Sequence, residues 1–371
     1  MSHDNLGSEQ SLSANSATNR IDKCDNELHS VSRRSALKGL ASGGGISLYS
    51  QIIEEKVEET KIVTATKGGE PLIVKSVPTK WWNQINKAER IQHELAKQYE
   101  DDPGIKDATL TVGEERIAGK RAGIVRVKID PNEENNSKIP DSKDGVDIEV
   151  DEWNELTLTA CNTDVDDPVR GGTQVDSVLS GKFSSCSRMV DGNYEYMLSA
   201  AHAFDACAGE AIGSKMYQPT EDDQYCGDVF IIDKSLDIAL VDNSGNLSNG
   251  YSDIIDGVLE DVAGVVTESG LKDRLGSKVD KMGRTTCGGS ATLDEVNQAR
   301  SLDCASDVKK HIKTSHSVDG GDSGGIFFDT VTLAGEKHAL VVGMITASLP
   351  DGAVGPAGYA IEDELTGYEF Y

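Results

Sequence analysis

Hydrophobic and polar positions follow different patterns in the two halves of this 371-residue chain. In the stretch WWNQINKAERIQHELAKQYEDDPG, which begins at Trp81, apolar residues recur mostly at steps of three and four, until Pro103 and Gly104 end the pattern. This period indicates one amphipathic helix. The two adjacent tryptophans are interpreted as core residues rather than as a ligand platform.

Two strands are predicted after this helix. Residues Ile124–Ile129 and Val146–Val150 alternate apolar with charged side chains, which is typical of a strand with one face in water. The segment between them is polar and rich in turn residues. Residues 60–155 are therefore predicted to form a small α+β module, separate from the C-terminal part of the chain.

Beyond Asp166 the pattern changes to short apolar runs interrupted by Gly, Asn, Asp and Ser. Such runs predict an all-β sandwich or barrel. Residues 1–31 are polar, rich in Asn and Ser and without apolar period, so we expect a disordered leader. The expected division is 1–53 for leader and signal, 54–165 for the module and 166–371 for the β domain.

Net charge narrows the range of partners. Asp and Glu outnumber Lys and Arg by 63 to 36, and the formal net charge is −27. This charge argues against nucleic acid or an anionic membrane as the main partner. Because the acidic residues are spread along the chain, we expect a halophilic protein adapted to a saline medium; an ordinary acidic surface is the alternative.

The segment SRRSALKGLASGGGISLYS, from Ser32 to Ser50, sets two arginines before a weakly apolar, glycine-rich stretch. It resembles a twin-arginine export signal, although Ala36 stands where a bulkier apolar residue is usual. The resemblance implies a secreted protein that is exported folded. The alternative interpretation is a basic patch before a flexible linker.

Cysteine usage agrees with export. The chain has seven cysteines, and Cys24 precedes the two arginines and would be removed with the signal, which leaves six. An even number suits disulfides, and disulfides persist outside the cytosol. No apolar run is long enough to predict a transmembrane helix in the mature protein.

The segment SVDGGDSGGIFF places Ser323 between glycines and beside an aspartate. A serine hydroxyl is nucleophilic only where a base takes its proton and donors stabilise the oxyanion; otherwise such a serine is a turn residue. Among the seven histidines, His202 has the most distinctive context, since in YEYMLSAAHAFDAC it follows an alternating strand and two alanines. A lone histidine is nevertheless more often structural than catalytic.

A catalytic histidine also needs a carboxylate that holds the imidazole in the right tautomer. Asp237 precedes the apolar run Ile238–Val241, and Asp228 precedes Val229–Ile232, which is just as apolar. A carboxylate at the end of a buried strand needs a partner, and an imidazole is suitable. The flanking residues therefore favour Asp237 and Asp228 equally as the partner of the histidine. The alternative for either is a surface carboxylate at a strand end.

In the order His, Asp, Ser, the segments SAAHAFDAC, DIALV and GDSGG resemble the three signature segments of the chymotrypsin (trypsin-like) family of serine endopeptidases, and the compact lengths resemble its microbial branch. The resemblance covers about residues 171–371 and implies two six-stranded antiparallel β-barrels. It implies that Ser323 is the nucleophile and His202 the general base and acid. It also favours Asp237 over Asp228 as the residue that orients the histidine.

The same resemblance implies an oxyanion hole made by the backbone N–H groups of Gly321 and Ser323, where glycine lets the amide turn toward the substrate. Ser317 is neutral at a position where a carboxylate would select Arg or Lys, so we expect cleavage after small or apolar residues. The residues implied to line the primary pocket are Ser317, Thr346, Ala347, Ser348 and Gly358.

The segment MGRTTCGGSATL resembles part of the microbial members of that family. Likeness to the family, rather than geometry, suggests two disulfides, and the remaining two cysteines could pair only by elimination. The implied pairs are Cys186–Cys207 and Cys287–Cys304, which leave Cys161 and Cys226.

These features predict a secreted serine endopeptidase that acts on protein or peptide substrates without metal or organic cofactor. GDSGG also fits the nucleophile elbow of α/β-hydrolases, but those enzymes place the histidine after the serine, and only His338 follows Ser323. A catalytically silent relative that binds a protein or peptide is the second alternative. The module is expected to be a pro-region removed near residues 160–172, making the chain a zymogen, or else a permanent accessory domain.

Overall fold

β-Strands dominate the described part of the chain, as expected. The computed structural model describes residues 57–99, 102–129, 138–152, 169–177, 181–192, 194–204, 211–218, 224–245, 251–254, 261–302 and 305–371. The leader, the export signal and the division at residue 165 lie outside these ranges. All described residues belong to one unit, Lys56–Tyr371.

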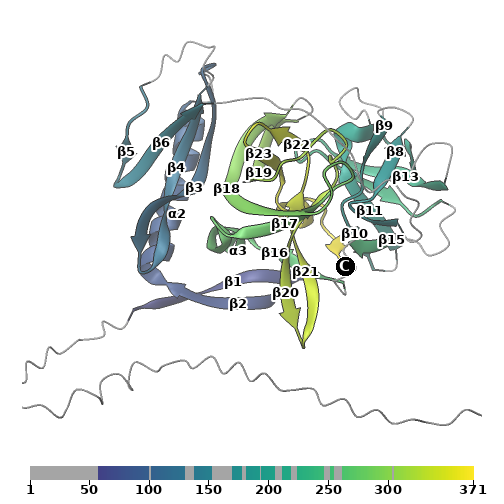
Figure 1. Cartoon of the computed structure of the whole chain (residues 1–371), viewed down its shortest axis with the longest axis horizontal. Coiled ribbons are helices and arrows are strands. Elements are labelled where there is room, and N and C mark those ends of the chain that lie inside the picture. Colours follow the sequence, from purple (N-terminus) through teal and green to yellow (C-terminus); the bar gives the residue numbers. More distant parts are fainter. Residues whose placement is uncertain are drawn as a thin grey trace, which may run out of the picture. The chain divides into compact units, whose positions relative to one another are not determined.

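The N-terminal module is one helix packed on strands (Figure 1). The predicted helix is confirmed as α2, and the two predicted strands are confirmed within β4 and β6. The other four strands of the module were not predicted. The module contains β1 (Glu59–Lys67), β2 (Glu70–Pro78), α2 (Thr79–Gln98), β3 (Ile105–Ile117), β4 (Lys120–Ile129), β5 (Ser142–Lys143) and β6 (Val146–Glu152).

Helix α2 buries the apolar side that its period predicts, including Trp81 and Ile85. The indole Nε1 of Trp81 donates to the Arg121 carbonyl at 2.8 Å, so this tryptophan is a core residue. At Gly123 on β4, an added Cβ would lie 3.0 Å from Ile85 and 3.3 Å from Ala88. Glycine therefore lets the helix pack closely on the sheet.

The first β domain carries one large sheet. Within the described residues this sheet has eight strands in the order β24-β10-β11-β14-β13-β12-β8-β9, and β7 and β15 form a separate parallel pair. Its elements are β7 (Val169–Gly171), β8 (Gln174–Ser177), β9 (Gly181–Ser184), β10 (Arg188–Asp191), β11 (Tyr194–Ala200), the 3₁₀ helix η1 (Ala201–Phe204), β12 (Lys215–Gln218), β13 (Gln224–Asp233), β14 (Ile238–Asp242) and β15 (Tyr251–Ile254).

The second β domain shares its sheet with the module. The order in the described residues is β2-β1-β16-β21-β20-β17-β18-β3-β4-β6-β5, with β19, β22 and β23 branching from β18. Its elements are β16 (Val262–Val266), α3 (Glu268–Arg274), β17 (Lys278–Met282), β18 (Gly289–Leu302), β19 (Ala305–Thr314), β20 (Ile326–Leu333), β21 (Glu336–Met344), β22 (Ala347–Leu349), β23 (Gly352–Pro356), α4 (Gly358–Glu364) and β24 (Glu369–Phe370).

The expected β fold with two barrel-like domains is confirmed, but its sheets differ from two purely antiparallel six-stranded barrels. The C-terminal strand β24 crosses to the first domain and pairs with β10. Strands β16 and β21 pair in parallel, as do β4 and β6. Module strands extend the second sheet at both ends, which enlarges it.

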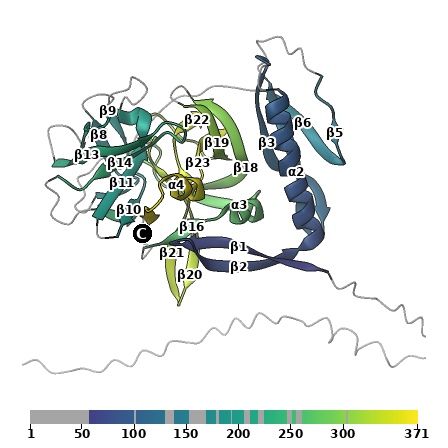
Figure 2. The ribbon, with the colours of Figure 1, turned by 180° about the vertical axis from the view of Figure 1, so that it is seen from behind.

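The module joins the second β domain through strand pairing, where the sequence indicated a separate unit. Ala65 on β1 pairs with Val266 on β16, and Leu110 on β3 pairs with Val296 on β18. Figures 1 and 2 show these strands side by side from both directions. Backbone hydrogen bonds therefore connect the module to the β domain at two places.

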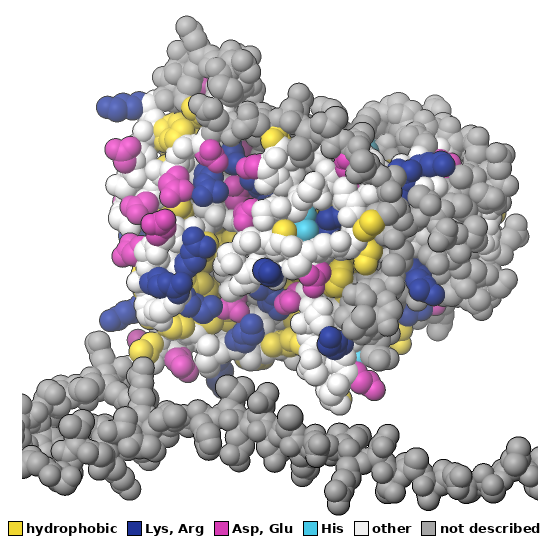
Figure 3. All heavy atoms as spheres, viewed as in Figure 1, with side chains coloured by type: hydrophobic (Ala, Val, Ile, Leu, Met, Phe, Trp, Pro, Cys, Tyr) yellow, Lys and Arg dark blue, Asp and Glu magenta, His cyan; other side chains and the backbone are white. Residues whose placement is uncertain are grey.

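Acidic and basic side chains share the face drawn in Figure 3, where Asp and Glu lie among Lys and Arg. The excess of acidic residues is thus not gathered into one patch on the described part of this face. No helix in the described residues is long and apolar enough to cross a membrane.

Candidate active site

Strand pairing in the first β domain places His202 and Asp237 side by side. Ala200, the last residue of β11, pairs with Ile238, the first residue of β14, in antiparallel register. In such a pair the end of one strand lies beside the start of the other. The Ala201 N–H accordingly donates to the Asp237 carbonyl at 3.0 Å.

Two hydrogen bonds hold the carboxylate against the histidine. His202 Nδ1 lies 2.6 Å from Asp237 Oδ2, and the His202 backbone N–H donates to Oδ1 at 2.8 Å. Asp237 is 2% exposed, and its φ of 57° is a left-handed conformation that aspartate tolerates better than most residues. With Nδ1 bound to the carboxylate, Nε2 is the nitrogen left to exchange a proton.

The pKa of His202 is raised above its ordinary value. Burial acts in the opposite direction because it disfavours the charged imidazolium. The hydrogen bond and the negative charge of Asp237 outweigh burial. Asp228, the rival aspartate on β13, instead donates its backbone N–H to Asp242 at 3.0 Å. The structure therefore brings Asp237, and not Asp228, to the histidine.

The turn that carries Ser323 is tied to the strand that leads to the histidine. The Ser184 N–H donates to the Ser323 carbonyl at 2.9 Å. The hydroxyl of Ser199 on β11 donates to the Ser184 carbonyl at 2.7 Å. At Gly324, where φ is 86°, an added Cβ would lie 2.1 Å from that same carbonyl, so only glycine allows this approach. Sequence reasoning did not identify Ser184 or Ser199.

The Ser323 hydroxyl donates to the Thr346 carbonyl at 3.1 Å. Among the described residues, no hydrogen bond joins Ser323 to His202. Rotation about the Cα–Cβ bond of Ser323 would be needed to exchange the carbonyl acceptor for an imidazole. Catalytic hydrogen bonds in ligand-free enzymes are often formed only when substrate binds.

Gly321 occupies a position that excludes other residues. Its φ is 97°, and an added Cβ would lie 2.4 Å from Arg284 Nη1 and 2.6 Å from Thr285 Oγ1. Its carbonyl accepts from the Ser184 hydroxyl at 2.8 Å. Among the described residues, the N–H groups of Gly321 and Ser323 donate no hydrogen bond.

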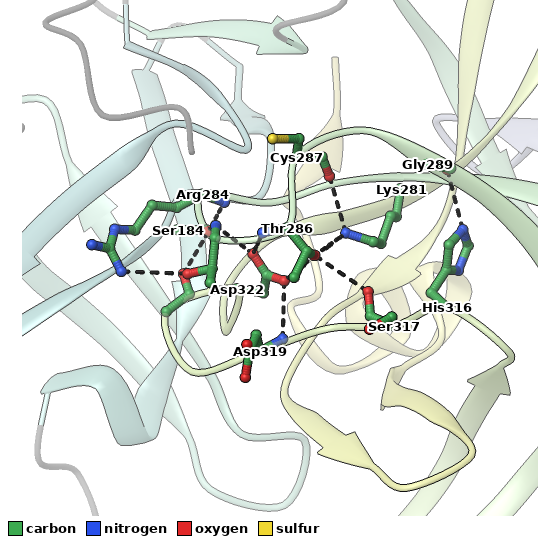
Figure 4. A network of polar contacts seen from close by, with 12 residues as sticks. Ser184, Lys281, Arg284, Thr286, Cys287, Gly289, His316, Ser317, Asp319 and Asp322 are labelled. Atoms are coloured by element: carbon green, nitrogen blue, oxygen red, sulfur yellow. Dashed lines mark hydrogen bonds and ion pairs between the residues drawn. The ribbon is translucent and has the colours of Figure 1, made fainter. Parts of the chain in front are cut away.

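A fully buried carboxylate, Asp322, separates these two N–H groups in the chain. Its Oδ1 accepts from the N–H groups of Thr285 at 2.6 Å and Thr286 at 3.0 Å. Its Oδ2 accepts from the Asp319 N–H at 3.1 Å and from the Thr286 hydroxyl (Figure 4). These donors fix the conformation of the turn. The sequence reasoning used GRTT only as a family likeness and missed this role.

Among the described residues, Lys281 is the cation nearest to Asp322. Its Nζ lies 3.9 Å from Asp322 Oδ2, and it donates to the Cys287 carbonyl at 3.0 Å and to the Thr286 hydroxyl (Figure 4). Lys281 is 3% exposed, and burial lowers its pKa while Asp322 acts in the opposite direction. The Arg284 Nε instead donates to Gln174 at 2.7 Å.

The residues expected in the primary pocket lie in three places. Thr346 is buried, and Ala347 and Ser348 begin β22. Ser317 is exposed, and its carbonyl oxygen lies 3.3 Å from the oxygen of the Thr286 hydroxyl, which donates to Asp322. Gly358 begins α4, where an added Cβ would lie 2.7 Å from Val265 and 3.1 Å from the Val341 carbonyl. The structure therefore places Gly358 in the packing of α4 against Val265 and Val341.

The expected disulfides have different outcomes. Cys287 is disulfide-bonded, and its expected partner Cys304 lies outside the described residues. Cys186 is a free, fully buried thiol whose pKa is raised by burial. The expected Cys186–Cys207 bond is therefore wrong for this structure, because an apolar environment rather than a disulfide encloses Cys186. Cys161 and Cys207 lie outside the described residues.

The described residues hold no group of three or more His, Cys, Asp or Glu side chains arranged to bind a metal ion. The second histidine–aspartate pair, His338 Nδ1 with Asp261 Oδ1, lies on the surface at β21. The pKa of His338 is raised, chiefly by its hydrogen bond to Asp261.

No protein-family model matches this chain, and no curated protein matches it. Among solved structures, a glutamic acid-specific serine protease is 18% identical, with a TM-score of 0.41 over 55% of this chain and 100% of that one. Nocardiopsis protease is 18% identical, with a TM-score of 0.38 over 54% and 98% of the two chains. Thermobifida fusca protease A is 19% identical, with a TM-score of 0.39 over 54% and 97%. The structural neighbours are thus chymotrypsin-like serine proteases at low identity, and the residues of the site carry the functional conclusion.

Proposed function

We propose that this chain is a secreted serine endopeptidase. The observation that carries the proposal is the buried Asp237 carboxylate, bound at 2.6 Å to Nδ1 of a histidine with a raised pKa. Ser323 adds a hydroxyl on a glycine-bounded turn, with two backbone N–H groups beside it. A binding module would have no need of all these features together.

In the proposed reaction, His202 Nε2 takes the Ser323 proton as Oγ attacks the substrate carbonyl carbon. The N–H groups of Gly321 and Ser323 donate to the oxyanion that forms. The imidazolium, stabilised by Asp237, gives its proton to the leaving amine as the C–N bond breaks. Water, deprotonated by His202, then hydrolyses the acyl-enzyme and restores the serine. Before attack, Ser323 must turn from the Thr346 carbonyl toward the histidine.

Small or apolar residues are the proposed preference at the cleaved position. Ser317 supplies no negative charge that would attract Arg or Lys, and its side chain is exposed. Profiling the enzyme with a peptide library tests the preference, which strict cleavage after Arg or Lys would refute.

The module is proposed to be a pro-region, with cleavage near residues 160–172. Its strand pairing with the second β domain suits a segment that assists folding before removal. N-terminal sequencing after incubation of the pure chain tests this, because an intact start just after the signal would support a permanent accessory domain. Export by the twin-arginine route and adaptation to a saline medium complete the proposal; greatest stability in dilute buffer would contradict the latter.

Labelling with a fluorophosphonate probe tests the endopeptidase proposal. Wild type should be labelled, whereas Ser323→Ala and His202→Ala should not be, in both low and high salt. His338→Ala is the matched control, since it removes the other histidine–aspartate pair. Retained labelling in His338→Ala separates the proposed triad from an α/β-hydrolase arrangement. Folded wild type that is not labelled would favour the silent binding module.

A further inference from the structure

Buried charges cross the boundary between the module and the second β domain. Lys128 on β4 and Lys313 on β19 are each 2% exposed, and Glu295 on β18 is fully buried. Charged groups are rarely buried to this extent unless they are paired. The three residues come from separate strands, so their pairing depends on how the module is docked.

Glu295 lies among three cations. Its Oε1 is 3.6 Å from Arg126 Nη1, 3.7 Å from Lys313 Nζ and 3.9 Å from Lys128 Nζ. Gln298 donates to the other carboxylate oxygen. Two of the three cations, Arg126 and Lys128, belong to the module. Glu295 would therefore keep only one cation if the module were absent.

The same lysines also hold Asp351. Its Oδ2 lies 3.0 Å from Lys128 Nζ and also accepts a hydrogen bond from Lys313. Burial acts to raise the pKa of Asp351, but the two lysines outweigh it and lower the pKa to about 2. Asp351 is therefore ionised at neutral pH. About half of its side chain is exposed. Lys128 is further paired with Asp151 at 3.4 Å.

Asp351 lies in the two-residue turn between β22 and β23, since Leu349 pairs with Gly352. Strand β22 contains Ala347 and Ser348, which the family resemblance implies as substrate-binding residues of the proposed endopeptidase. The hairpin continues into the nucleophile site, because the Thr346 N–H donates to the Val354 carbonyl at 2.9 Å. The Thr346 carbonyl in turn accepts from the Ser323 hydroxyl at 3.1 Å.

We propose that Lys128 of the module positions the substrate-binding hairpin β22–β23 through its ion pair with Asp351. The inference rests on the proposed function only for the role of that hairpin. Lys128 is a positioning residue, since it acts through Asp351 and is not placed at the reacting atoms. Departure of the module removes Lys128 and leaves Asp351 paired with Lys313 alone, so the hairpin of the separated β domain becomes less constrained.

Hydrogen exchange tests the proposal in the full chain, with Ser323→Ala as background so that the module stays attached. Lys128→Met and Asp351→Asn should each speed exchange of the amides in residues 347–354, by about tenfold. Lys128→Arg should restore most of the protection because it keeps the charge. The double variant Lys128→Met with Asp351→Asn should exchange no faster than Asp351→Asn alone, since Lys128 acts on the hairpin only through Asp351.

Lys120→Met is the matched control. Lys120 also lies on β4 and pairs across the boundary with Asp273 of α3, but it makes no contact with the hairpin in the described residues. Amide exchange in residues 347–354 of the Lys120→Met variant should match that of the background protein. Equal acceleration by Lys120→Met would show a general loosening of the module and overturn the proposal.

Unchanged exchange in both Lys128→Met and Asp351→Asn would also overturn it, as would additive effects in the double variant. If Lys128→Met does not fold, Asp351→Asn decides, because it changes only a half-exposed turn residue. The labelling of wild type at Ser323 is a separate experiment. If wild type is not labelled but the variants show the expected changes in amide exchange at residues 347–354, the endopeptidase proposal is rejected and the Lys128–Asp351 coupling stands.

Discussion

Two fully buried carboxylates in the second β domain are stabilised in different ways. Asp322 accepts three backbone N–H donors, and its nearest cation, Lys281, is 3.9 Å away. Glu295 lies among three cations that come from β4 and β19. Both are 0% exposed, so neither can rely on water.

The difference arises from the elements that each carboxylate connects. Backbone N–H groups have fixed positions in their turns. Their hydrogen bonds to Asp322 therefore fix the conformation of the turn that contains Gly321 and Ser323. Long cationic side chains reach across elements, so Glu295 connects strands far apart in the sequence. Backbone amide donors thus let Asp322 fix the conformation of one turn, whereas cationic side chains let Glu295 connect the module to the second β domain.

Asp237 resembles Asp322 in accepting a backbone N–H, that of His202, and in addition it binds the imidazole. Its substitution should have the largest effect. Asp237→Asn should lower kcat by about 10⁴-fold, because the amide favours the wrong tautomer of His202. If the proposed activity is present, wild type should lose it as pH falls through the raised pKa of His202, because protonated His202 cannot act as a base. In the variant this acid limb should move to lower pH. A pH profile of kcat/KM measures both effects, and an unmoved limb would contradict the assignment of Asp237.

Asp322→Asn should come next. We expect kcat/KM to fall by about 10²-fold, because the amide NH₂ faces N–H groups that need an acceptor and the oxyanion donors are displaced. Lys281→Met should cost only about tenfold, since the three N–H donors to Asp322 remain. Peptide hydrolysis by the two variants measures this ranking. Equal losses would mean that the charge of Lys281, and not the backbone, holds the turn.

Glu295→Gln should affect stability more than activity. Removing the buried charge of Glu295 leaves Lys128 and Lys313 with Asp351 as their one shared carboxylate, which should cost about 3 kcal/mol of unfolding free energy. The rate of fluorophosphonate labelling should change less than about threefold, because the nucleophile turn is untouched. Urea unfolding measures the loss of stability, and the rate of fluorophosphonate labelling measures the effect on the nucleophile turn. A loss of labelling as large as that of Asp322→Asn would contradict the different roles of the two carboxylates.

Glu362 on α4 sharpens the comparison, because within the described residues it has one N–H donor, Phe370 at 3.1 Å, and no ion pair. Burial raises its pKa to about 7. The folded state therefore binds this proton more tightly than the unfolded chain, so stability falls as pH rises from about 4.5 to 7. Glu362→Gln should flatten this part of the curve. Melting temperatures measured across that range, as the difference between variant and wild type, provide the check.

The sequence predicted helix α2 well because its apolar period reports directly on one buried face. The hairpin strands β1 and β2 escaped prediction, since their apolar residues do not alternate in a simple way and the partner of β1 outside the hairpin, Val266, lies far along the chain from Ala65. The turn at Gly68 and Gly69, with φ of 56° and 75°, was a signal for that hairpin that the pattern of apolar residues did not include.

The candidate triad was predicted as residue types rather than as geometry. Flanking sequence could not separate Asp237 from Asp228, because both precede equally apolar strands. Antiparallel register separated them, since only Asp237 lies opposite the end of β11. The expected Cys186–Cys207 bond failed for a related reason: spacing and likeness report nothing about the buried environment that encloses a thiol.

By itself the sequence determined the chemistry available to this protein: a serine among glycines, a histidine after a strand, an acidic composition and a helical module. These are local properties, set by side-chain type and by the period of apolar positions. Family likeness had favoured Asp237, and the strand register brings it to the histidine. Tertiary structure alone decided which donors surround Asp322 and that Lys128 reaches Asp351. Those contacts join residues as far as 223 positions apart, and strand pairing, which local sequence does not encode, brings them together.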